Sequence, residues 1–74
     1  MEGEPMKVPE KFPPRTEFLE DRSSGSWVKF PDGRVFKLDD ESGELKPRDA
    51  LPVGSLVGSY SEAEFLRFAK AAAE

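Results

Sequence analysis

A Pro-Asp-Gly turn at residues 31–33, between two short segments with alternating apolar residues, limits the folds open to this chain. A two-residue loop at the Asp-Gly pair would mix charged and apolar side chains on both faces of the resulting hairpin. A type I turn with Gly33 in the left-handed region gives a three-residue loop instead, and it pairs Val28 with Phe36. We therefore predict a hairpin over residues 26–39 in this second register.

The second register gives the hairpin one apolar face and one mixed face. The apolar face carries Val28, Phe30, Phe36 and Leu38. The mixed face carries Trp27, Lys29, Val35 and Lys37, with Arg34 near the turn. We expect the apolar face to form the core. Two uses are open for the mixed face: the lysine stems cover Trp27 and Val35, or these side chains bind a partner.

Further strands are expected on both sides of this hairpin. Residues 16–21 suit a short strand with Phe18 pointing inward. Residues 44–46 suit a third antiparallel strand, and Pro47 either ends this strand or marks it as an edge strand. Residues 47–60 read as a loop with four apolar contacts to the core. Those contacts are Leu51, Val53, Leu56 and Val57.

A helix is predicted at the C-terminal end of the sequence. Ser61 and Glu64 have the spacing of a capping box, and apolar residues from Phe65 onward recur on one side of the helix. The expected fold class is α+β: a small three- to four-stranded antiparallel sheet, made of the hairpin 26–39 plus short strands, packed on one C-terminal helix.

The first fourteen residues contain four of the seven prolines and few apolar residues. Such a segment buries little surface, so we predict an extended or disordered proline-rich arm over 1–14 and a single domain over 15–74. An alternative is that the arm binds a partner around Phe12 and Arg15, because its prolines favour an extended conformation.

The chain has no cysteine and no histidine, which excludes disulfides, thiolate or imidazole metal sites, and catalysis by a histidine base or a cysteine nucleophile. The densest acidic group, Asp39, Asp40 and Glu41, does not fit a calcium loop, because the first ligand position falls on Leu38. We expect no enzyme activity, no cofactor and no metal. The acidic group is either a solvated turn or a contact for a basic partner.

Eleven basic and fifteen acidic residues give a net charge of −4, which disfavours general affinity for nucleic acid or anionic membranes. No apolar run is long enough for a membrane span, and the first residues lack a signal-peptide core, so we expect a cytoplasmic protein. The composition favours a small acidic regulator or accessory protein that binds a larger protein. Single-stranded nucleic-acid binding through Trp27, Lys29 and Lys37 is the alternative. A monomer or weak homodimer is expected.

Overall fold

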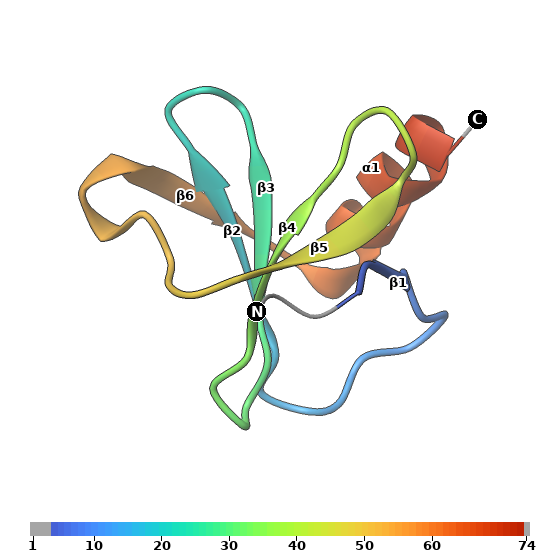
Figure 1. Ribbon diagram of the computed structural model, residues 1–74, viewed down its shortest axis with the longest axis horizontal. Helices are drawn as coiled ribbons and strands as arrows, with labels where there is room; N and C mark the ends of the chain where they lie inside the picture. The colour runs from blue at the N-terminus through green and yellow to red at the C-terminus, as the bar shows by residue number, and fades with distance from the viewer. Residues whose placement is uncertain (1–3, 74) are drawn as a thin grey trace.

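The structure is a computed structural model that describes residues 4–73. It is an α+β fold with one C-terminal helix and an antiparallel sheet, as predicted (Figure 1). The sheet has six strands rather than three to four. Its elements are β1 (Met6–Lys7), β2 (Glu17–Asp21), β3 (Ser26–Lys29), β4 (Val35–Leu38), β5 (Glu44–Arg48), the 3-10 turn η1 (Val53–Ser55), β6 (Leu56–Tyr60) and the helix α1 (Glu62–Ala73).

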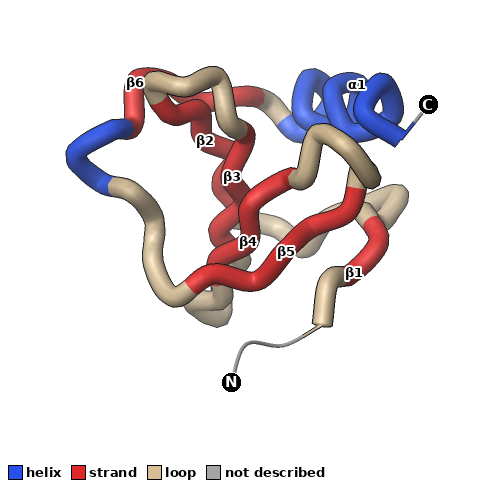
Figure 2. Tube along the Cα trace, turned by 45° about the horizontal axis from the view of Figure 1, so that its top comes forward, coloured by secondary structure: helices blue, strands red, loops and turns tan. Residues whose placement is uncertain are grey.

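Strands β2 to β5 form a meander, and each pairs antiparallel with the next along the chain. Strand β6 then returns to the free side of β2, and β1 covers the free side of β5 (Figure 2). The strand order is therefore β1-β5-β4-β3-β2-β6. The two additional strands are those at the edges, and each depends on a neighbour that is distant in sequence.

The predicted hairpin register is confirmed. Val28 faces Phe36, and the Phe30 N–H donates a 2.8 Å hydrogen bond to the Arg34 carbonyl oxygen. Gly33 closes the turn by donating its N–H to the Phe30 carbonyl oxygen at 3.0 Å, with a φ of 97°. Glycine adopts this left-handed conformation at little cost.

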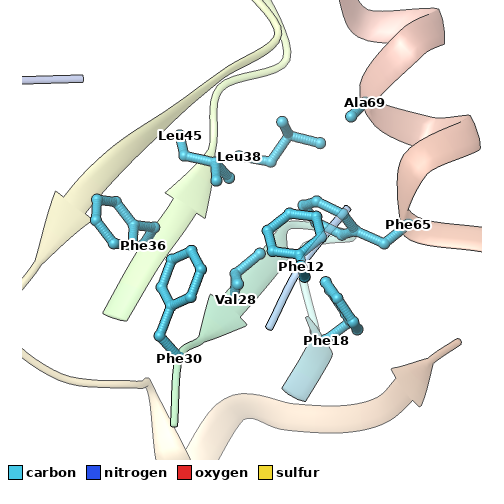
Figure 3. Packing of buried hydrophobic residues seen from close by; sticks show 9 residues of the cluster. All are labelled: Phe12, Phe18, Val28, Phe30, Phe36, Leu38, Leu45, Phe65 and Ala69. Carbon is cyan, nitrogen blue, oxygen red and sulfur yellow. The ribbon is translucent and has the colours of Figure 1, made fainter. Parts of the chain in front are cut away.

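The core lies between the inner face of the sheet and the helix (Figure 3). Its buried members are Phe12, Phe18, Val28, Phe30, Phe36, Leu38, Leu45, Phe65 and Ala69. The two expected loop contacts at Val53 and Val57 are wrong, because these side chains are 78% and 58% exposed. Leu51 and Leu56 are half-buried.

Phe12 is a core residue, so its side chain is not available as the contact that the partner-binding arm would need. It is 3% exposed, and its ring centroid lies 4.9 Å from that of Phe18 and 5.8 Å from that of Phe65. Two rings from the N-terminal part of the chain and one from the helix therefore close the core together. Arg15, the other predicted arm contact, is exposed and has a φ of 70°.

The capping box at the start of α1 is confirmed. The Glu64 N–H donates to Ser61 Oγ at 3.2 Å, and the Ser61 N–H donates to Glu64 Oε1 at 3.3 Å. The far end of the helix lies against the β4–β5 turn, where a Cβ on Gly43 would come within 2.7 Å of the Ala73 Cβ. Because Gly43 also has a φ of 74°, both space and backbone conformation require glycine here.

Candidate interaction surface

The outer face of the sheet, opposite the core, carries four of the ten residues that were predicted to bind a partner, namely Trp27, Lys29, Val35 and Lys37. Cross-strand register places Trp27, Lys37 and Lys46 in one row, and Lys29, Val35 and Arg48 in the next. We call Lys29, Lys37, Lys46 and Arg48 the basic patch. Strands β3 to β5 therefore present four cations on this face, and the alternation of β5 adds one carboxylate, Glu44.

Trp27 lies on the predicted face, but its ring is not exposed. The side chain is 7% exposed, its Nε1–H donates a 2.8 Å hydrogen bond to Asp21 Oδ2, and Lys37 Nζ lies 5.6 Å from the ring centroid. Val35 on the same face is also 7% exposed. Of the two uses considered for this face, the geometry matches the one in which lysine stems cover Trp27 and Val35.

Asp21 fixes the position of the Trp27 ring. Its Oδ1 accepts hydrogen bonds from the Ser23 and Gly25 N–H groups, both at 2.8 Å. The hydrogen bond from Trp27 is the main cause that lowers the pKa of Asp21, with further lowering from the Gly25 and Ser23 N–H groups and the Lys37 charge. Burial opposes this shift. The lowered pKa favours the charged carboxylate, which accepts the hydrogen bond that holds the Trp27 indole in place.

The basic patch places like charges side by side. Lys37 and Lys46 are direct cross-strand partners, an arrangement that is unfavourable for the folded sheet. Lys46 Nζ lies 3.2 Å from Asp39 Oδ2, whereas no ion pair of the described residues involves the other three cations. Lys46 and Arg48 were not among the residues predicted to bind a partner. The alternation around the buried Leu45 is the signal that could have identified them.

The acidic turn beside the patch divides into one structural residue and two exposed ones. Asp39 Oδ1 accepts a hydrogen bond from the Glu41 N–H at 3.1 Å, and Oδ2 accepts one from Ser42 Oγ at 2.8 Å. The pKa of Asp39 is lowered most by the hydrogen bond from the Glu41 N–H, and further by the Ser42 hydroxyl and by Lys46. Asp40 and Glu41 are exposed. Within residues 4–73, no group of three or more potential ligand residues could hold a metal ion.

Arg34 lies at the end of the sheet, beside an open hollow of about 380 Å³. Its guanidinium pairs with Asp32 through Nε at 2.7 Å and stands 4.9 Å from the Phe30 ring centroid. The hollow is lined by Glu4, Met6, Arg34, Val35, Phe36, Pro47 and Arg48. Two predicted contact residues, Arg34 and Val35, therefore meet Arg48 of the basic patch at one site.

Comparison of the chain with protein-family models, with curated proteins and with solved structures finds no match. Among the described residues, no helix is both long and apolar enough to cross a membrane.

Proposed function

We propose that this chain is a non-catalytic protein–protein interaction module that binds an acidic segment of a larger protein, and thereby regulates or inhibits it. The observation that carries the proposal is the basic patch. A chain with a net charge of −4 concentrates four of its eleven cations on neighbouring strands of one sheet face. A carboxylate-bearing partner complements that charge, and complementarity of this kind gives specificity and fast association.

The patch is suited to binding because its cations are already close together. Carboxylates placed over Lys37 and Lys46 would relieve the repulsion between the two ammonium groups. Because this repulsion destabilises the unbound protein, its relief makes the binding free energy more favourable. The three lysines of the patch are half-buried, which restricts their stems. Less side-chain entropy is lost on binding when a contact group is restricted beforehand.

The test is a titration with a glutamate-rich peptide at low salt, followed by the fluorescence of Trp27, the only tryptophan. The double variant Lys37→Gln/Arg48→Gln removes two patch charges. The control variant Arg67→Gln/Lys70→Gln removes two exposed charges from the helix. We expect affinity to fall about tenfold in the patch variant, the equivalent of about 1.4 kcal/mol, and to stay unchanged in the control. Equal affinities in the two variants would contradict the proposal.

Single-stranded nucleic acid is a second candidate, since the same four cations could neutralise phosphates. Its weakness is Trp27: base stacking needs an exposed ring, and this one is 7% exposed. Titrating a thymidine oligonucleotide under the same conditions separates the two classes. Tight oligonucleotide binding without peptide binding would overturn the protein-binding proposal, and binding of neither probe would overturn both.

A further inference from the structure

We infer that the free edge of β6 pairs with β6 of a second copy of this chain, so that two sheets join in an antiparallel, two-fold symmetric contact. Strand β6 is the last strand of the sheet, and its only partner among the described strands is β2 (Figure 2). A strand in this position presents unpaired N–H and C=O groups to which another strand can pair. This contact is separate from the basic patch, which lies on β3 to β5.

The hydrogen bonds around β2 show which of its residues face β6. The Asp21 N–H donates to the Gly25 carbonyl oxygen at 3.0 Å, toward β3. The Arg22 N–H donates to the Ser55 carbonyl oxygen at 2.9 Å, on the side of β6. Because the backbone groups of successive residues in a strand point to alternate sides, Glu20 and the residue two positions before it direct their N–H and carbonyl groups to β6.

The same alternation leaves the backbone of Ser59 without a partner in the sheet. The residue of β6 opposite Glu20 is Gly58, and the one opposite Phe18 is Tyr60. Gly58 and Tyr60 therefore direct their backbone groups to β2, whereas Ser59, between them, directs its N–H and carbonyl to the free side. The register shift between β2 and β6 lies before Gly58, so it does not alter this assignment.

Apolar side chains are exposed along the same edge. Among residues 4–73, the large apolar side chains that are exposed are Val53, Val57 and Phe68. Val57 belongs to β6, and Val53 belongs to η1 directly before it. The ring centroid of Phe68 lies 4.9 Å from that of Tyr60, the last residue of β6. All three therefore lie in or next to the edge strand, where a second copy can remove apolar surface from water.

The composition of β6 favours a second copy as the partner strand. Residues 56–60 contain no charged side chain and no proline, which are the residues that protect many edge strands. Two copies can therefore pair here without like charges facing each other within the strands, although each chain has a net charge of −4. The opposite edge of the sheet, β1, has only two residues and includes Lys7.

The backbone directions also set the register of the contact. A two-fold axis at Ser59 lets each Ser59 N–H donate to the Ser59 carbonyl oxygen of the other copy. Gly58 then lies opposite Tyr60 of the other copy in a pair without hydrogen bonds, where the two strands approach most closely. Because glycine has no side chain, this close pair is free of steric conflict at Gly58.

Sedimentation equilibrium of the full chain tests the association. We expect the average mass to rise from 8.3 kDa toward twice that value as the protein concentration is raised from about 10 μM to about 1 mM, since a contact through one short strand is weak. A mass of 8.3 kDa over the whole range would overturn the inference.

Ser59→Pro and Ser59→Ala form a matched pair of variants. Proline lacks the N–H and is tolerated in an edge strand where this group faces solvent, so it removes the donor directed at the second copy and keeps the pairing of β6 with β2. Alanine keeps the N–H. We expect the proline variant to stay monomeric at about 1 mM and the alanine variant to associate like the unaltered protein. Circular dichroism checks that both are folded. Equal association of the two folded variants would contradict the inference.

A second pair, Ser59→Lys and Ser59→Gln, tests the register and does not depend on how the proline variant folds. With the two-fold axis at this position, the introduced lysine faces its own copy, whereas glutamine is uncharged and of similar length. We expect the Kd of the lysine variant to be about fivefold higher than that of the glutamine variant at low salt. The ratio should fall below about twofold at about 1 M salt, where the repulsion is screened. Equal Kd values at low salt would show that the two copies do not meet at this residue.

Discussion

The two faces of the β3–β4 hairpin both bury aromatic rings, but by different means. On the inner face Phe30 and Phe36 meet edge to face, with 5.3 Å between ring centroids, inside an apolar core. On the outer face Trp27 is covered by Lys37 and held by a carboxylate. The inner face is stabilised mainly by apolar packing, with the Arg34 guanidinium over the Phe30 ring at its end, whereas the outer face keeps a lysine and a carboxylate around its aromatic ring. A face built in the second way stays accessible to a charged partner.

The largest expected effect is on the inner face. Phe36→Ala leaves a cavity among aromatic neighbours, and we expect it to lower the free energy of unfolding by about 3–5 kcal/mol. Urea denaturation measures this, with Val53→Ala as a control at a 78% exposed position. A loss below about 1 kcal/mol would show that the inner face is not the core of the domain.

Trp27→Phe is the corresponding test of the outer face. It keeps an aromatic ring but removes the N–H that donates to Asp21, so a buried carboxylate loses one of its hydrogen bonds. We expect a loss of about 1–3 kcal/mol in the same denaturation experiment. No measurable loss would contradict the role of the Trp27–Asp21 hydrogen bond.

The pH dependence of stability is a further test of the outer face, because the carboxylate of Asp21 holds the Trp27 ring there. The folded-state pKa of Asp21 lies below the ordinary value of an aspartate, so its contribution to stability is present above about pH 4 and is lost as pH falls through the lowered folded-state pKa. We expect the difference in unfolding free energy between the unaltered protein and Asp21→Asn to shrink below pH 4. A difference that stays constant from pH 7 down to about pH 2 would contradict this assignment.

The smallest effect is expected at the surface layer. Lys37→Ala removes the stem and the cation over Trp27, and we expect a loss of about 0.5–1 kcal/mol. The emission of Trp27 should shift to longer wavelength as water reaches the ring. Arg67→Ala, an exposed residue of the helix, serves as the control, and a spectrum identical to that of the unaltered protein would show that Lys37 does not cover the ring.

The hairpin and the helix were predictable because short-range chemistry specifies them. The Pro-Asp-Gly turn fixes the register that pairs Val28 with Phe36, and the Ser61–Glu64 capping box fixes the start of the helix. Strand β6 was not predictable in the same way. Its sequence contains Gly58 and no apolar alternation, and it becomes a strand only because β2 offers a free edge.

The candidate surface was only half predictable, for a related reason. Alternation assigns a residue to a face of the sheet, but it does not say what covers that face. The burial of Trp27 depends on Asp21, which a loop brings back to the indole N–H. For Lys46 and Arg48, alternation around Leu45 indicates the face, but only the register of β5 with β4 shows that they lie beside Lys37 and Val35.

The contact between Phe12 and Phe65 has a consequence for how the chain reaches its folded state. These rings belong to segments near opposite ends of the described chain, so their meeting closes a loop that contains the entire meander. Contacts between residues so far apart in sequence slow folding, because the entropy of loop closure is lost before the contact forms. During synthesis, a chain that ends before the helix leaves Phe12 and Phe18 without their partner ring. Cooperative folding must therefore wait until the helix has been made.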